Sequence, residues 1–207
     1  MFADAMARLP PQPAPTPVAE YKQRQDRLTS QFKKDDLFIL AAPGEAVHSN
    51  DVHYRFRTSS DILYLTGWSD PESSVVLRYD EGCWKTCLFV QPKDTLKEIW
   101  EGRRPGVEGA LADYAVDEAY PSSELEECLD EWFPHCKRVF HRGGVNVHLD
   151  GMVDSAVLRR DRPRQHFGTG PFVVQDPTSL LAELRLRKSA SEIEQMKYAS
   201  DVASLAH

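Results

Sequence analysis

Histidine is the residue of this sequence best suited to bind a transition metal, but its spacing gives no metal-binding motif. The chain has seven histidines, at positions 48, 53, 135, 141, 148, 166 and 207. No HExxH motif occurs, and no two histidines stand four residues apart, as they would to share one face of a helix. His135 next to Cys136 is an isolated pair. We therefore expect no complete metal site within these residues.

The four cysteines are also poorly placed for shared chemistry. If residues 83–91 form a strand, Cys83 and Cys87 lie on one face about 13 Å apart, at ~3.3 Å per residue. That separation is too large for a common metal ion or a disulfide. Cys128 and Cys136 match no zinc pattern. We expect reduced, partly buried thiols, as in a cytosolic protein.

Motifs for covalent catalysis and for phosphate binding do not occur: GxSxG, GxGxxG and GxxxxGK[ST] are all missing. Charge is concentrated in LRRDRPRQH (158–166), which has arginines at 159, 160, 162 and 164. On composition alone, these cations favour the C-terminal end of a solvated helix. The alternative is that one arginine binds a ligand carboxylate, a task suited to its planar guanidinium. The scattered aspartates, Asp51 among them, indicate turn or cap residues.

Composition and charge exclude some function classes. Of the 207 residues, 41% are hydrophobic, which suits a packed core, and the formal net charge is −7. A nucleic-acid binder usually shows a basic excess, so we expect no nucleic-acid partner. No apolar run approaches the roughly 18 residues needed to span a bilayer. The N-terminus lacks the basic and apolar regions of a signal peptide. We expect a cytoplasmic protein without membrane contact.

Hydrophobic periodicity predicts alternating strands and helices. PPQPAPTP (10–17) predicts an extended, mobile leader. Apolar runs predict strands at LFILAAP (37–43), ILYLTG (62–67), SVVLRY (74–79), CWKTCLFVQ (83–91) and RVFHR (138–142). The second to fourth of these runs are joined by short turns, which suggests an antiparallel meander. Helical spacing predicts helices over about 18–32, 122–133 and 148–160.

The C-terminal stretch from 179 predicts two helices broken near Lys188. Ser189 followed by Glu192 has the spacing of a capping box, so a second helix is expected to start there. Its apolar face has no evident partner, and a helix seldom leaves such a face exposed. We expect this helix to be mobile or packed on another chain, as if a second domain begins here. The alternative is a terminal helix that folds back onto the first domain.

One loop-like segment, EIWEGRRPG (98–106), places a large indole beside backbone breakers. Gly102 and the Pro105-Gly106 pair indicate irregular backbone, which normally lies on the surface. Trp100 therefore has no evident partner within its own segment.

Several segments together resemble the N-terminal domain of the aminopeptidase P (Xaa-Pro aminopeptidase) family, within the creatinase-like "pita-bread" metallohydrolases. FRTSSDILYLTGWSDPESSVVL (56–77) carries the family's Arg, Ser-Asp, YLTG and Pro in order. EIWEGRRPG resembles the EIW-x-GRR segment, and VAEYKQRQDRLTSQF (18–32) resembles the opening helix. The C-terminal stretch resembles the passage into the catalytic domain, with R-x-x-K-S-x-x-E-I at 185–193. Thr58 departs from the family's usual Gln.

The resemblance implies an α/β fold, with a mixed β-sheet flanked by helices on both faces, plus the first helix of a catalytic domain outside this sequence. It implies a leader over 1–17, the domain over 18–176 and linker helices over 177–207. In tetrameric relatives, the Trp at the position of Trp100 reaches a neighbouring subunit's active site. Asp51 and Arg164 match residues at the mouth of that site, Arg164 with a one-residue gap.

The resemblance also implies the activity of the whole enzyme. Two metal ions, commonly manganese, activate a water that attacks the peptide bond before proline. Their ligands belong to the other half, so we expect the present chain alone to be inactive and to bind no stoichiometric manganese. Expected partners are proline-containing peptides and further copies, as a dimer or tetramer. The alternatives are a stand-alone binding module with the same fold, or the N-terminal half of a creatinase-type hydrolase.

Overall fold

The computed structural model describes residues 10–161 and 172–206, without the side chains of Trp100, Glu101 and Asp161. Within that part of the chain, the main sheet has six strands: β1 (Asp36–Ala41), β4 (Ser74–Asp80), β5 (Cys83–Val90), β6 (Glu118–Pro121), β7 (Arg138–His141) and β8 (Val173–Gln175). Their order across the sheet is β6-β5-β4-β1-β7-β8. β4 runs antiparallel to both of its neighbours, and the other adjacent pairs are parallel. The predicted mixed sheet is therefore confirmed.

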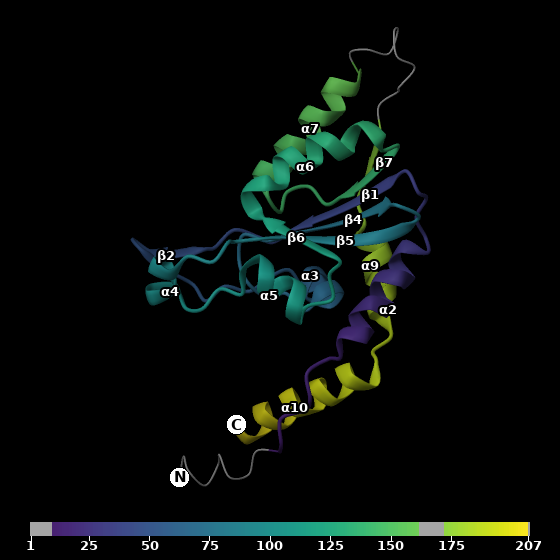
Figure 1. Ribbon diagram of the computed structural model, residues 1–207. Coiled ribbons are helices and arrows are strands. Elements are labelled where there is room, and N and C mark those ends of the chain that lie inside the picture. Colours follow the sequence, from purple (N-terminus) through teal and green to yellow (C-terminus); the bar gives the residue numbers. More distant parts are fainter. Residues whose placement is uncertain (1–9, 162–171, 207) are drawn as a thin grey trace.

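Helices cover both faces of the sheet (Figure 1). One face carries α2 (Val18–Thr29), α3 (Ser60–Thr66), α5 (Gly106–Asp113) and α9 (Thr178–Leu186). The other face carries α6 (Leu125–Trp132) and α7 (Val147–Asp161). Short 3₁₀ turns, Ser122–Glu124 and Phe133–His135, flank α6. The helices predicted over 18–32, 122–133 and 148–160 are confirmed to within a few residues at each end. Among the described helices, none is long and apolar enough to cross a bilayer.

The central strand β1 shows why both faces are covered. All six of its residues are buried. Leu37 and Ile39 join the apolar cluster under α6 and α7, while Phe38 and Leu40 join the cluster under α2, α3 and α9. Successive side chains of a strand point to opposite faces, so a continuous apolar run requires a layer on each side. The run LFILA thus specifies a central strand of a three-layer domain.

The strand predicted at ILYLTG is wrong, because residues 60–66 form helix α3. The Ser59 hydroxyl accepts the Asp61 backbone N–H at 3.2 Å and begins the helix. Gly67, with φ of 78°, ends it in the left-handed region. The predicted meander is therefore confirmed only for β4 and β5. A short apolar run does not distinguish a buried strand from a buried helix turn.

Gly67→Ala is expected to lower the free energy of unfolding by about 1–2 kcal/mol, because an L side chain is disfavoured at positive φ. A Cβ at this position would also lie 3.0 Å from the Tyr21 ring. Urea unfolding followed by circular dichroism measures the change. Gly44→Ala is the matched control, since a Cβ at Gly44 meets open space and its φ is not positive. An equal cost for the two variants would contradict the assigned cap.

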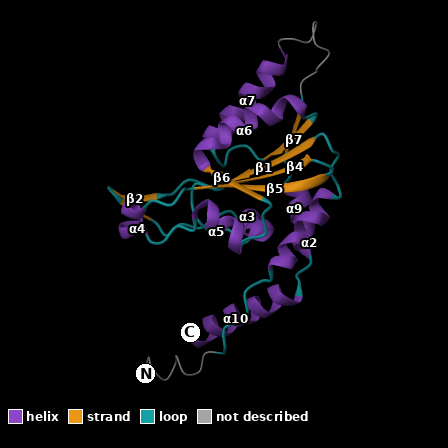
Figure 2. Cartoon of the chain, in the orientation of Figure 1, coloured by secondary structure: helices purple, strands orange, loops and turns teal. Residues whose placement is uncertain are grey.

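The last helix, α10 (Ala190–Ala206), leaves the sheet domain (Figure 1). Figure 2 shows the loop that separates it from α9. The predicted capping box is confirmed: the Ser189 N–H donates to Glu192 at 2.9 Å, and the Glu192 N–H donates to the Ser189 hydroxyl at 3.1 Å. No residue of α10 is buried, so the helix does not fold back onto the sheet. The leader over 10–17 forms neither helix nor strand.

Candidate functional site

The three site residues predicted from the resemblance do not form one site within the described residues. Asp51 is exposed in the turn between β2 (Val47–Ser49) and β3 (Val52–His53). Trp100 lies in helix α4 (Thr95–Glu101), and its side chain is outside the described part. Arg164 lies entirely outside the described residues. In the view of Figure 1, β2 and α4 lie at the same end of the domain.

The segment EIWEGRRPG is helical at its start, which corrects the prediction of a loop throughout. The Asp94 carboxylate accepts the N–H groups of Leu96 and Lys97 at 3.1 and 3.2 Å and begins α4. Gly102, with φ of 91°, ends the helix. The Glu98 carboxylate then accepts the Arg104 N–H at 3.0 Å and holds the chain as it turns toward α5. A short capped helix, rather than an irregular loop, therefore carries Trp100.

Five large apolar residues of this helix and of the β2–β3 hairpin region are exposed. On α4, Leu96 is 75% exposed and Ile99 is 71% exposed. On and beside the hairpin, Val47, Val52 and Tyr54 are each more than half exposed. Single exposed apolar residues are ordinary, but groups of them mark interaction surfaces. We call these five residues the apolar rim.

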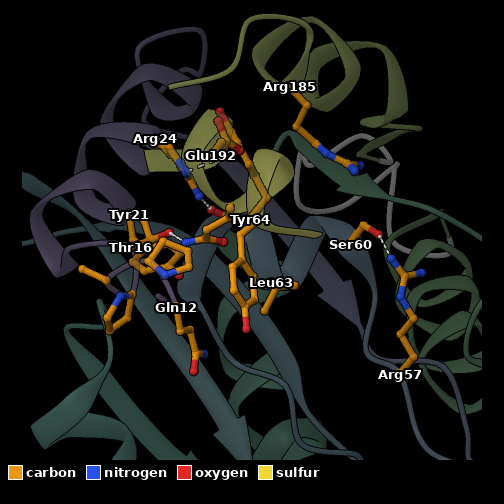
Figure 3. A pocket seen from close by; sticks show the side chains of 15 residues that line it. Gln12, Thr16, Tyr21, Arg24, Arg57, Ser60, Leu63, Tyr64, Arg185 and Glu192 are labelled. Atoms are coloured by element: carbon orange, nitrogen blue, oxygen red, sulfur yellow. Dashed lines mark hydrogen bonds and ion pairs between the residues drawn. The ribbon is translucent and has the colours of Figure 1, made fainter. Parts of the chain in front are cut away.

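A cavity of about 650 Å³ lies elsewhere, between the leader and helices α2, α3, α9 and α10 (Figure 3). Its charged lining residues are Arg24, Arg57, Arg185 and Glu192. Asp51 is not among its described lining residues. Of the three residues predicted for the substrate entrance, the one whose side chain is described, Asp51, therefore lies outside this cavity.

Arg24 on α2 organises this cavity. It is buried, it pairs with Glu20 one turn earlier, and its Nη1 donates to the Tyr64 main-chain carbonyl at 2.9 Å. Its guanidinium also lies 4.3 Å from the centre of the Tyr64 ring, a cation–π contact. The first turn of α10 supplies a second anion, because Glu192 lies 3.5 Å from Arg24 Nη2. Figure 3 shows Arg24, Tyr64 and Glu192 gathered on one side of the cavity.

A second ion pair fixes α9 to α3. Arg185 Nη1 lies 2.6 Å from the Asp61 carboxylate, 124 positions away in sequence. The Tyr64 hydroxyl donates to the Leu184 carbonyl at 3.1 Å, and burial raises the pKa of Tyr64, which keeps this donor protonated. Lys188 Nζ donates to the carbonyls of Arg185 and Leu186 at the end of α9. These contacts anchor the C-terminal end of α9.

Gln25, beside Arg24, is a buried polar hub. Its amide nitrogen donates to the carbonyls of Leu65 and Ala115 at 2.8 and 2.7 Å. Its amide oxygen accepts the Thr86 hydroxyl at 2.8 Å. One side chain of α2 therefore joins α3, β5 and the segment before β6.

In the described part of the arginine-rich stretch, Arg159 and Arg160 make contacts that stabilise the fold. Arg159 on α7 pairs with Asp130 on α6 at 2.5 Å. Arg160 donates to the carbonyls of Phe133 and Cys136. These contacts tie α7 to α6. They support the interpretation of the described part as a helix end rather than a ligand site.

The described residues do not suit a metal centre. Within 10–161 and 172–206, no three His, Cys, Asp or Glu side chains gather closely enough to hold an ion. All four cysteines are free, with Cys87 and Cys136 buried. Burial raises the pKa of Cys136 to about 12, so this thiol is unreactive near neutral pH.

Sequence reasoning missed Arg24, Gln25 and Tyr64, and it identified Glu192 only as a cap. A signal was present for Gln25, because helical spacing puts this polar residue on one stripe with Tyr21, Leu28 and Phe32. For Asp61, Arg185 and Glu192, the signal was their place in the motifs that carry the resemblance. Neither signal indicates which residues contact one another, because the pairs join distant parts of the chain.

Comparison with known proteins agrees with this architecture. The sequence pattern described as "Aminopeptidase P, N-terminal domain" matches residues 21–140. The Xaa-Pro aminopeptidase of Escherichia coli (strain K12) is 30% identical over 189 residues, which are 91% of this chain and 43% of the relative. The mitochondrial intermediate cleaving peptidase 55 of Arabidopsis thaliana is 32% identical, covering 90% of this chain and 35% of the relative.

Solved structures give the same result. Zn-substituted E. coli aminopeptidase P in complex with product matches with a TM-score of 0.84 and 29% identity, covering 94% of this chain and 44% of that chain. Proline aminopeptidase P II from Yersinia pestis matches with a TM-score of 0.82 and 33% identity, covering 93% and 44%. The chain thus spans less than half the length of these relatives.

Proposed function

The chain belongs to the aminopeptidase P N-terminal domain family, and on that premise we propose that it serves as the non-catalytic N-terminal domain of a Xaa-Pro aminopeptidase. Such an enzyme removes the N-terminal residue that precedes a proline. The observation that carries the proposal is the fold match over 94% of the chain, joined to the family pattern over 21–140. The peptide chemistry itself would belong to a catalytic domain outside these residues.

The domain's own contribution, in this proposal, is to shape the entrance for substrate. Helix α4 would present Trp100 to the active site of a neighbouring subunit, where an indole can pack on a proline ring. Asp51 and Arg164 would orient charged groups of the peptide at the mouth. The exposed position of Asp51 supports this role, because its carboxylate is open to a ligand or a partner subunit.

We also propose that the domain takes part in a homo-oligomer, a dimer or tetramer. The support is the apolar rim, whose Leu96 and Ile99 are largely exposed beside Trp100 in the sequence. Burial of such residues between subunits contributes roughly 25 cal/mol per Å² of apolar surface. Assembly would thereby bring α4 to another subunit.

The metal ions of the enzyme would be bound elsewhere. The family's two divalent ions, manganese in our proposal, need a cluster of carboxylates and histidine, and the described residues hold no such cluster. No step of the metal-assisted hydrolysis is therefore assigned to this chain. We place the enzyme in the cytoplasm, a compartment in which the four free thiols would remain reduced.

Peptide hydrolysis tests the proposal. The full-length protein, loaded with manganese, is expected to cleave Ala-Pro-Ala and to leave Ala-Ala-Ala intact, as followed by release of free alanine. The 207-residue chain alone is expected to cleave neither peptide. Equal cleavage of the two peptides would indicate a different specificity. Failure of the full-length protein to cleave either would favour a binding module, and cleavage by the 207-residue chain would contradict the non-catalytic assignment.

A further inference from the structure

The first turn of α10 contacts the sheet domain through the ion pair of Glu192 with Arg24. Glu192 also forms the capping box with Ser189. From these contacts we propose that Glu192 is a positioning residue, whose carboxylate fixes the direction in which α10 leaves the sheet domain. Glu192 lies outside the family pattern over residues 21–140 but within the R-x-x-K-S-x-x-E-I stretch that resembles the family. The inference concerns the geometry of this chain and stands apart from the proposed peptidase activity.

Glu192 uses its two carboxylate oxygens for two different tasks. Oε2 accepts the Ser189 N–H at 2.9 Å and closes the capping box within α10. Oε1 lies 3.5 Å from Nη2 of Arg24 on α2. One oxygen therefore belongs to the helix, and the other links the helix to the sheet domain.

The cation at this link is itself held in place. Arg24 is only 6% exposed, and its contacts with Glu20 and Tyr64 leave its guanidinium little freedom. A charge contact at a partly buried site is screened less than one in open solvent. The Glu192 side chain is 26% exposed, so the pair meets that condition. Arg24 is thus a fixed point against which α10 can be oriented.

Among the described residues, the rest of α10 contributes nothing to the core, and Gln195 and Tyr198 are only half-buried where they line the cavity beside the leader. None of the α10 residues is buried, whereas α9 buries Leu181 and Leu184 in the core. Between the two helices the chain is extended at Arg187, with ψ of 123°. A short non-helical connection thus separates an anchored helix from an unburied one (Figure 2). In such a case the polar contacts at the first turn set the direction.

The leader provides the other contacts to α10. Gln195 donates to the Thr16 hydroxyl at 3.0 Å, and the Thr16 and Ser191 hydroxyls lie 3.4 Å apart. Thr16 stands two residues before Val18, the first residue of α2, so these contacts also link α10 to the helix that carries Arg24. They are neutral hydrogen bonds at the surface of the cavity. The charged Arg24–Glu192 contact is the stronger of the two kinds.

The variant Glu192→Gln separates the two tasks of the residue. Glutamine can still close a capping box, but it has no charge to attract Arg24. The direction of α10 is read in the 207-residue chain from amide residual dipolar couplings in a weakly aligned sample. In the parent chain, the couplings of 190–206 are expected to fit the alignment tensor of the sheet. In Glu192→Gln they are expected to lose that fit and fall towards zero, while the sheet couplings persist.

Two further variants control this result. Glu194→Gln makes the same charge change on the same helix at an exposed position, and its couplings are expected to match those of the parent chain. Ser189→Ala removes the cap hydroxyl but leaves the Glu192 carboxylate. The couplings of the later turns of α10 are therefore expected to fit the alignment tensor of the sheet. The proposal is overturned if the α10 couplings of Glu192→Gln still fit the alignment tensor of the sheet. It is also overturned if the α10 couplings of Ser189→Ala or of Glu194→Gln lose that fit as those of Glu192→Gln do.

Discussion

Gln25→Ala is expected to lower the free energy of unfolding by about 3–5 kcal/mol, because each buried group left without a hydrogen bond costs roughly 1–3 kcal/mol. The substitution leaves three such groups: the carbonyls of Leu65 and Ala115, and the Thr86 hydroxyl. Thr86 is only 3% exposed and Ala115 1%, so water reaches neither easily. A small domain has only about 5–15 kcal/mol of total stability, so this loss is large.

Urea unfolding of the 207-residue chain, followed by circular dichroism, measures this cost from the shift of the midpoint. The matched control is Gln23→Ala, on the same helix but exposed, which is expected to change stability by no more than about 0.5 kcal/mol. The assigned hub would be contradicted if the two variants unfolded at the same urea concentration.

Gln25 also shows which parts of the fold hydrophobic periodicity can predict. Gln25 falls at helical spacing on one stripe with Tyr21, Leu28 and Phe32, and this spacing can be read from the sequence because it is a local property. The strands at 37–43, 74–79 and 83–91 were predicted for a similar reason, since buried runs of this length and composition favour strands. Their order in the sheet could not be predicted, because it depends on contacts between distant segments.

The error at residues 62–67 has a definite physical cause. Ile62, Tyr64 and Leu65 suit a strand by composition, yet they suit one face of a short helix equally well. The Ser59 cap and the left-handed Gly67 decide between the two, and both depend on the backbone geometry of the flanking residues. The prediction for 98–106 failed in the same way, because Asp94 begins a helix ahead of the segment.

The candidate functional residues fall into two groups. The resemblance predicted the first group, and only the structure shows the contacts of the second. Trp100, Asp51 and Arg164 were named because their motifs match a family, and no spacing rule leads to them. The Arg24–Glu192 and Asp61–Arg185 contacts join segments far apart in sequence. A single sequence carries no record of such pairs.

In the full-length enzyme, Trp100→Ala is expected to lower kcat/KM for Xaa-Pro peptides by about 10- to 100-fold, or ~1.4–2.7 kcal/mol of transition-state stabilisation. The reason is the loss of the flat indole proposed to pack on the proline ring. Trp100→Phe keeps a flat ring and is expected to lose less. No described residue of α4 belongs to either core cluster, so the urea midpoint of the domain should stay within experimental error.

Steady-state kinetics on a series of Xaa-Pro peptides gives this value. Unchanged kcat/KM in Trp100→Ala would remove Trp100 from the substrate site. Equal losses in Trp100→Phe and Trp100→Ala would indicate that the flat ring is not what the substrate requires.

The central claim is that this domain completes the active site of another subunit, and subunit mixing tests it most directly. One partner is full-length Trp100→Ala with its metal site intact. The other partner keeps Trp100 but lacks a metal-binding carboxylate in the catalytic domain. On Xaa-Pro peptides, the first partner alone is expected to keep about 1–10% of the parent kcat/KM, and the second alone is expected to be nearly inactive. After co-refolding, activity well above the sum of the two is the predicted result, because intact metal sites then face intact Trp100. Activity equal to that sum would contradict the account.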